Sequence, residues 1–172
     1  GLRPRLEIVC DLSPERASQR ATDLGFSRYS DDWRAVVNDP AVELVSVCTP
    51  NDTHAEISIA ALAAGKHVWC EKPMSTSLAD SQAMTDAAAA SSGRTIIGYN
   101  YTKNPAVTHA RRLIESDAIG RVAAFFCRYD VDNEADGDRP WSWRMSRDQS
   151  GTGANGDVLS HVISVAHYLT GS

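Results

Sequence analysis

Short apolar runs alternate with amphipathic or alanine-rich segments over roughly the first two-thirds of the chain. We predict strands in the apolar runs, at residues 6–10, 44–48, 67–70 and 95–98. We predict helices in the segments between and after them, at residues 14–24, 31–38, 52–64, 77–91 and 105–116. Short, continuously apolar strands that alternate with helices are typical of a parallel sheet buried on both faces. The pattern therefore predicts an α/β fold with a doubly wound parallel sheet.

The alternation stops after the fourth predicted strand, and the rest of the chain has a different pattern. We expect a longer strand at residues 121–130, a polar and irregular stretch at 132–150, and a final helix at 157–169. We interpret the longer strand as the first strand of a second, α+β unit that the chain does not complete.

Composition and charge make several classes of function improbable. The chain has 17 basic and 22 acidic residues and no long run of one charge, so nucleic acid is not a favoured partner. No apolar run approaches the ~18–20 residues that a membrane helix needs. Cys10, Cys48, Cys70 and Cys127 lie in or beside apolar runs and have no CxxC spacing. We therefore expect buried free thiols in a reducing cytoplasm, rather than disulfides or a zinc site.

The segment 66–74, KHVWCEKPM, places a lysine at the end of a predicted strand. Pro73 cannot donate a ladder hydrogen bond, so strand pairing is expected to end there. Lys72 would then lie at the carboxyl edge of the sheet, where open α/β folds bind their ligands. An ammonium group in that position can stabilise the oxygen of a substrate alcohol or carbonyl. The alternative is a strand-end lysine in solvent, as most lysines are.

Asp157 and His161 are four residues apart, so on a helix their side chains project from one face. An imidazole can accept the hydroxyl proton of an alcohol near neutral pH. Asp157 could orient that imidazole or a neighbouring hydroxyl. The alternatives are a helix-stabilising surface pair or half of a metal site. No third ligand with suitable spacing is present, so a metal is not expected.

Residues 151–156, GTGANG, match the G-x-G-x-x-G pattern of dinucleotide-binding loops. That fingerprint requires a buried strand just before it and an acidic residue about 20 residues later. Neither condition is met, because RMSRDQS precedes the glycines and only a short segment follows them. We interpret these glycines as a turn that lets the backbone approach a ligand at a helix start.

Asp11 lies at the end of the first predicted strand, where such a fold places its ribose-binding acid. The matching glycine loop would lie about 20 residues earlier, so the first strand and the phosphate loop are expected to be absent from these 172 residues. A carboxylate at the ribose favours NAD over NADP, although Arg16 nearby leaves NADP open. The alternative for Asp11 is an acid that merely precedes a helix.

Four separated segments resemble the Gfo/Idh/MocA oxidoreductases, the family of glucose–fructose oxidoreductase and inositol 2-dehydrogenase. The segments are CTPNDTH at 48–54, EKP at 71–73, GYNY at 98–101, and GTGANGDVLSH at 151–161. Each is weak by itself, but the four occur in the order and spacing of the family. The resemblance covers essentially the whole chain.

The resemblance implies a Rossmann-like dinucleotide-binding domain at residues 1–102, incomplete at its N-terminus, and the start of a C-terminal substrate domain at 103–172. It implies a catalytic group of Lys72, Asp157 and His161. The residues expected to bind NAD, with NADP not excluded, are Asp11, Thr49, Pro50, Asn51, His54, Glu71, Lys72, Asn100, Trp143 and Arg144. The residues expected to bind substrate are Lys72, Tyr101, Asp157 and His161. The complete polypeptide is expected to be a homo-oligomer.

Two of these assignments have open alternatives. His54 could face the cofactor, or it could be a helix-start histidine whose hydrogen bonds are satisfied locally. Trp143 and Arg144 resemble a Trp-Arg pair found in many members of the family. The aromatic rings around them could line the nicotinamide or sugar site, or could pin a loop to the domain surface.

The function implied by the resemblance is hydride transfer between NAD(P) and a secondary alcohol of a sugar, inositol or related polyol. One alternative is a NAD-dependent glycosidase of the same family, in which transient oxidation helps to expel a leaving group. Another is a dinucleotide-binding sensor or regulator without catalysis. The presence of Lys72, Asp157 and His161 together argues against a sensor, because ligand binding alone does not require a proton acceptor.

Overall fold

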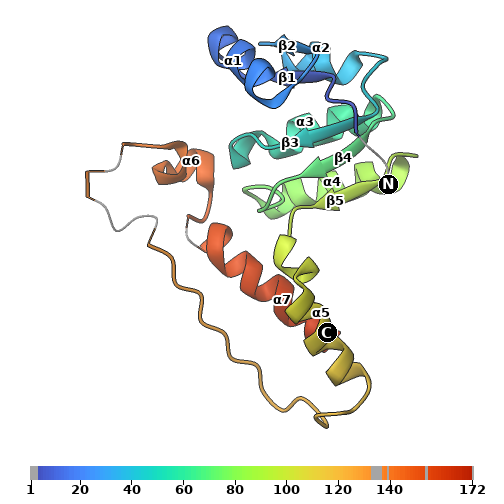
Figure 1. Ribbon diagram of the computed structural model, residues 1–172, viewed down its shortest axis with the longest axis vertical. Helices are drawn as coiled ribbons and strands as arrows, with labels where there is room; N and C mark the ends of the chain where they lie inside the picture. The colour runs from blue at the N-terminus through green and yellow to red at the C-terminus, as the bar shows by residue number, and fades with distance from the viewer. Residues whose placement is uncertain (1–3, 133–136, 139, 154, 172) are drawn as a thin grey trace.

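The computed structural model describes residues 4–132, 137–138, 140–153 and 155–171. All five of its strands are parallel to their neighbours, in two hydrogen-bonded groups (Figure 1). The strands are β1 (Ile8–Cys10), β2 (Arg28–Ser30), β3 (Leu44–Val47), β4 (His67–Cys70) and β5 (Thr95–Ile97). The first two form one group and the last three form the other, in the order β3-β4-β5. The predicted parallel α/β fold is confirmed.

Helices connect the strands and continue beyond them. The α-helices are α1 (Pro14–Leu24), α2 (Trp33–Asn38), α3 (His54–Ala63), α4 (Leu78–Ala90), α5 (Pro105–Glu115), α6 (Arg147–Ser150) and α7 (Ser160–Thr170). Short 3-10 segments are η1 (Asn51–Thr53), η2 (Asn100–Lys103) and η3 (Trp143–Met145), and η4 (Asn155–Leu159) is π-helical. Local sequence sets the ends of α1: the Ser13 side chain accepts a hydrogen bond from Arg16 N, and Gly25 ends the helix at φ 78°.

Strand β2 was not predicted from the sequence. Its residues, Arg28, Tyr29 and Ser30, form no apolar run. The strand exists because its backbone pairs with β1, as in the hydrogen bond from Arg28 N to Glu7 O at 2.9 Å. Such pairing requires only that a second strand edge be near, so a polar segment can form it.

The core lies between the sheet β3-β4-β5 and the helices α3 and α4, which cover one face of it. Val47 and Cys70 are each 1% exposed on that face. The opposite face is open: Leu44, Trp69 and Ile96 are 53%, 46% and 44% exposed. The described residues therefore leave this face of the three strands uncovered. An apolar run indicates that both faces favour burial, but only a covering element can bury them.

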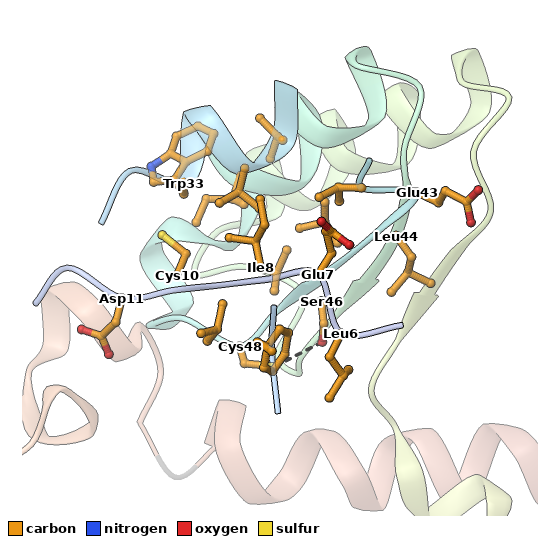
Figure 2. A pocket seen from close by; sticks show the side chains of 18 of the residues that line it. Leu6, Glu7, Ile8, Cys10, Asp11, Trp33, Glu43, Leu44, Ser46 and Cys48 are labelled. Atoms are coloured by element: carbon orange, nitrogen blue, oxygen red, sulfur yellow. Dashed lines mark hydrogen bonds between the residues drawn. The ribbon is translucent and has the colours of Figure 1, made fainter. Parts of the chain in front are cut away.

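A cavity of about 760 Å³ separates β1 from β3 (Figure 2). Residues 4–12 line one side and residues 41–49 line the other, and the two strands are not hydrogen-bonded to each other. The cavity lies where a further parallel strand would join the two groups. It therefore agrees with the interpretation that a strand is absent from these residues, which stays a prediction.

The second part of the chain begins with α5, which packs against α7 (Figure 1). Residues 121–132 are extended but belong to no sheet, so the predicted strand at 121–130 is wrong. A strand needs a partner edge for its backbone hydrogen bonds, and no strand among the described residues pairs with this segment. The expected irregular stretch at 132–150 contains η3 and α6, while residues 133–136 and 139 lie outside the described part.

Two smaller expectations also differ from the structure. The predicted helix at 157–169 is a π-helical turn followed by α7, which extends to Thr170. The four cysteines are free as predicted, but only Cys70 is buried, and Cys48 and Cys127 are exposed. In the described part of the chain, no helix has both the length and the apolar character to cross a membrane.

Candidate active site

Lys72 follows the central strand of the three-stranded group. Glu71 N donates to Val47 O on β3 at 2.9 Å, and Gly98 N donates to Cys70 O at 2.8 Å. The carboxyl ends of β3, β4 and β5 are thereby held at one edge, and the chain leaves β4 through a cis Lys72–Pro73 peptide bond. Lys72 thus stands at the carboxyl edge of a parallel sheet, as the sequence predicts.

The ammonium group of Lys72 contacts Asp157, which is 85 residues later in the chain. Its Nζ donates to the backbone carbonyl of Asp157 at 3.0 Å and also to the carboxylate Oδ1. The Lys72 side chain is only 17% exposed, whereas that of Asp157 is 40% exposed. This ion pair joins the sheet edge to the π-helical turn before α7.

His161 lies in the first turn of α7 and is buried. Burial lowers the pKa of its imidazole, and the positive charge of Lys72 lowers it further, whereas Asp157 and Glu71 act in the opposite direction. A lowered pKa keeps the ring neutral near pH 7, so it can accept a proton. Its Nδ1 atom is buried and has no hydrogen-bond partner in the described structure.

Three tyrosine rings surround the imidazole of His161. The rings of Tyr99 and Tyr101 meet it edge-on, at centroid distances of 6.1 and 4.7 Å. The ring of Tyr129 lies 6.2 Å away and nearly parallel to it, at 11°. The hydroxyl groups of Tyr101 and Tyr129 are hydrogen-bonded to each other, and this bond raises the pKa of Tyr129. Of these three tyrosines, only Tyr101 was expected at the site from the sequence.

The turn after β3 brings together His54 and Thr49, two of the residues expected at the cofactor. The His54 side chain faces the protein interior and not the solvent. The His54 ring is fully buried, and its Nδ1 and Nε2 atoms each lie 2.9 Å from a backbone carbonyl oxygen, of Pro73 and Thr49 respectively. The ring is thus held by backbone carbonyls of two different turns, one of them 19 residues away, and a role of His54 at the cofactor stays a prediction. The Thr49 hydroxyl accepts a hydrogen bond from the Thr53 hydroxyl at 2.7 Å.

Asn51, in the same turn, contacts the second part of the chain. Its Nδ2 atom donates to Ser150 O at 3.0 Å, and both residues are buried. Pro50, just before it, is half-buried. The amide of Asn51 therefore ties the end of β3 to α6, immediately before the glycine-rich turn.

Glu71 and Asn100 were also expected at the cofactor. The Glu71 carboxylate packs on the backbone of Gly98, where a Cβ atom would lie 2.7 Å from Oε1. Only glycine leaves room for the carboxylate in this place. Asn100 is exposed at the start of η2, next to this edge of the sheet.

Asp11 lies at the carboxyl end of β1, where it borders the cavity between β1 and β3 (Figure 2). Its Oδ1 atom accepts hydrogen bonds from Arg16 Nε at 3.0 Å, from Arg16 Nη2 at 2.7 Å, and from Ser13 N at 2.9 Å. The hydrogen bonds from Arg16, followed by that from Ser13, lower the pKa of Asp11. The carboxylate is charged and accessible, but the adjacent guanidinium partly balances it.

Trp143 and Arg144 contact each other in η3, since the guanidinium of Arg144 lies 4.5 Å from the Trp143 ring centroid. Trp143 is half-buried and Arg144 is exposed. The segment η3 packs on α6, which in turn packs on η1. The pair is therefore near the turn after β3, but no contact in the described structure joins it to Lys72 or His161.

The glycine-rich turn packs against the turn that follows Lys72. A Cβ atom on Gly151 would lie 3.0 Å from Thr76 Cβ, and one on Gly156 would lie 3.6 Å from Pro73 Cγ. The short helix α6, not a strand, precedes these glycines, which agrees with rejecting a pyrophosphate loop. Ala154 lies outside the described residues. The glycines allow the backbone before Asp157 to approach the sheet edge closely.

Comparisons with known proteins match both parts of the chain. Residues 3–99 match the profile described as the oxidoreductase family with NAD-binding Rossmann fold, GFO_IDH_MocA. Residues 107–172 match the profile of the GFO/IDH/MocA C-terminal domain.

Individual relatives are dehydrogenases of sugars and inositols. A levoglucosan dehydrogenase of Pseudarthrobacter phenanthrenivorans is 41% identical over 168 residues, covering 98% of this chain and 43% of the relative. The scyllo-inositol 2-dehydrogenase (NAD(+)) of Bacillus subtilis is 32% identical over 120 residues, covering 69% of this chain and 35% of the relative.

Solved structures give the same result. A levoglucosan dehydrogenase in complex with NADH and levoglucosan superposes with a TM-score of 0.90 at 38% identity, over 98% of this chain and 46% of that one. An oxidoreductase domain protein from Kribbella flavida has a TM-score of 0.90 at 40% identity, over 99% and 46%. The chain thus spans less than half the length of these relatives.

Proposed function

The chain belongs to the Gfo/Idh/MocA family of NAD-binding oxidoreductases, and from that membership we propose the activity of the polypeptide that contains it. The proposed activity is hydride transfer between NAD(P) and a secondary alcohol of a sugar, inositol or related polyol. The observation that supports it most directly is the meeting of Lys72, Asp157 and His161 at the carboxyl edge of the sheet.

We propose that the dinucleotide-binding domain comprises residues 1–102 and that the substrate domain begins at residue 103. The two profile matches, 3–99 and 107–172, lie on either side of this division. In the structure, β5 ends at Ile97 and α5 begins at Pro105, so the division falls in a short connecting segment.

The residues at this edge fit a dinucleotide. Asp11 offers an accessible carboxylate for a ribose hydroxyl, and Thr49, Glu71 and Asn100 follow the ends of the neighbouring strands. The buried, unpartnered Nδ1 of His161 is a polar atom that a bound ligand could satisfy. When bound, the nicotinamide supplies the redox chemistry by accepting or returning the hydride. The Arg16–Asp11 pair leaves NADP open as an alternative cofactor.

The chain's own residues would handle the proton and the oxygen. The neutral imidazole of His161 accepts the hydroxyl proton of the alcohol, because burial and Lys72 lower its pKa. The ammonium of Lys72 stabilises the negative charge that develops on the substrate oxygen. Asp157 holds that ammonium through its carboxylate and its backbone carbonyl. From the sequence, Asp157 was expected to orient the imidazole or a neighbouring hydroxyl, and the contact with Lys72 adds a further role to that proposal.

Among sugars, we propose an anhydrosugar such as levoglucosan as the first substrate to test. The levoglucosan dehydrogenase of Pseudarthrobacter phenanthrenivorans is 41% identical to this chain, and the match covers 98% of the chain. Tyr99, Tyr101 and Tyr129 would give the site an aromatic wall next to His161, and such a wall suits the apolar face of a compact sugar ring. A homo-oligomer stays a prediction for the complete polypeptide.

The test is formation of NADH by the complete polypeptide with levoglucosan, inositols and other polyols. Lys72→Ala should abolish turnover without unfolding the protein, whereas Lys103→Ala, at an exposed position, should retain it. Near-normal turnover of Lys72→Ala would remove Lys72 from the mechanism. Release of an aglycone without net NADH would identify a glycosidase. Saturable NAD binding without turnover on any substrate would favour a sensor.

A further inference from the structure

One of the rings around His161 comes from an extended segment of the second part of the chain. Tyr129 lies in residues 121–132, which pair with no described strand. Its ring is stacked nearly parallel to the imidazole of His161, at 11° and with the centroids 6.2 Å apart. The rings of Tyr99 and Tyr101 meet the same imidazole edge-on. Among the described rings, that of Tyr129 is therefore the one that lies along the face of the imidazole.

A contact between two hydroxyl groups holds the ring of Tyr129 in this place. The hydroxyls of Tyr101 and Tyr129, 28 residues apart in the sequence, are hydrogen-bonded, and the two rings meet edge-on with centroids 5.6 Å apart. Tyr101 belongs to η2, which packs on α7, the helix that carries His161. The hydroxyl bond thus ties the extended segment to the elements that build the site.

We propose that Tyr129 is a positioning residue for His161: its ring, held by the hydroxyl bond to Tyr101, screens the imidazole from water. His161 is only 8% exposed, although it is not part of the hydrophobic core under the sheet, so the side chains around it must cover it. Exclusion of water disfavours the charged imidazolium and so keeps the ring ready to accept a proton. The inference rests on the proposed function, because it takes His161 as the base of that reaction.

The charges that act on His161 do not replace this screen. Burial is the largest cause of its lowered pKa, Lys72 lowers the pKa further, and Asp157 and Glu71 raise it. On α5, which packs against α7, Arg111 lies over a different ring of α7 and not over the imidazole. Because burial is the largest cause, exposing the imidazole to water must raise the pKa of His161 even when every charge stays in place.

The experiment measures how fast diethyl pyrocarbonate modifies each histidine of the complete polypeptide, without added cofactor or sugar. The reagent acylates the neutral imidazole, so the rate as a function of pH gives the pKa of a ring, and the plateau rate reports its accessibility. Mass spectrometry of the peptides separates His161 from the other histidines. The exposed His109 on α5 is the internal standard.

The variant is Tyr129→Ala, and the matched control is Phe126→Ala in the same extended segment, where the side chain is 93% exposed. We expect Tyr129→Ala to speed the modification of His161 several-fold and to move its pH midpoint upward, while His109 reacts as before. Phe126→Ala should change neither quantity. If His161 has the same rate and the same midpoint in both variants, the screening role is overturned.

Tyr129→Phe separates the ring from its hydroxyl, and at this half-buried position it removes only one oxygen atom. We expect His161 to react at a rate between those of the wild type and Tyr129→Ala, because the ring remains but has lost its bond to Tyr101. A wild-type rate would show that the hydroxyl bond does not hold the ring, and would overturn that part of the proposal.

None of these measurements uses turnover, so a failure of the screening role would leave the oxidoreductase assignment unchanged. Conversely, the screen would stand in an enzyme that proves inactive on every sugar, provided that Tyr129→Ala exposes His161 and Phe126→Ala does not.

Discussion

The hydrogen bond from Asn51 to Ser150 gives a quantitative test of how the two parts of the chain are joined. The perturbation is Asn51→Ala, which removes the donor Nδ2 and leaves Ser150 O without it. The bond is 3.0 Å long, and Asn51 and Ser150 are 5% and 6% exposed, so water cannot readily replace the lost donor. An unsatisfied buried carbonyl costs about 1–3 kcal/mol, and we expect the free energy of unfolding to fall by that amount.

The matched control is Asn38→Ala. The amide of Asn38 also donates to a backbone carbonyl, that of Arg34 at 2.8 Å, but on an exposed surface of α2. Water can replace that bond, so we expect a change below about 0.5 kcal/mol.

The assay is urea unfolding followed by tryptophan fluorescence, with hydrogen exchange to locate the effect. Because the lost bond holds α6 to η1, exchange should increase first in the amides of residues 147–157. If Asn51→Ala and Asn38→Ala lose the same stability and show no local exchange difference, the bond does not hold these segments together. The inference that the hydrogen bond from Asn51 to Ser150 holds α6 against η1 would then be wrong.

Three further predictions concern charge and space at the sheet edge. Lys72→Met should raise the pKa of His161 in an NMR titration, because it removes the neighbouring positive charge that lowers this pKa and leaves the effect of burial in place. An unchanged pKa would contradict the described geometry. Gly98→Ala should push the Glu71 carboxylate aside, at a cost of about 1 kcal/mol in the free energy of unfolding. Because the charge of Glu71 raises the pKa of His161, moving that charge away should lower the pKa of His161. Burial raises the pKa of Cys70 to about 11, so a thiol reagent at mildly alkaline pH should modify the exposed cysteines first and this one only after unfolding. Equal rates for all four thiols in the folded chain would refute the burial.

The local elements could largely be predicted because their signals are local. The helix at Pro14–Leu24 has its N-cap serine, its first-turn proline and its C-terminal glycine within a few residues, and the structure has the same bounds. Lys72 at a strand end could be predicted because Pro73 ends any ladder. The proximity of Lys72 to the Asp157–His161 segment followed only from the family resemblance, since 85 residues separate the ion pair.

Other features of the site depended on partners that no local pattern shows. Tyr129 lies beside His161 through the path of an extended segment that pairs with no described strand. His54 and Asn51 were predicted at the cofactor because they belong to the turn after β3. In the structure both side chains are buried and hydrogen-bonded to backbone carbonyls, an orientation that a motif does not state.

The sequence by itself determined the alternation of strands and helices, the end of the strand at Pro73, and the family motifs. Each of these features depends only on residues that are close together in the sequence. Only the tertiary structure decided that β2 exists, that residues 121–130 form no strand, and which groups pair at the sheet edge. The physical reason is that hydrogen bonds and burial need a second surface. The spacing of apolar residues shows which side of a segment favours burial. Only the packing of the whole chain determines whether another element covers that side.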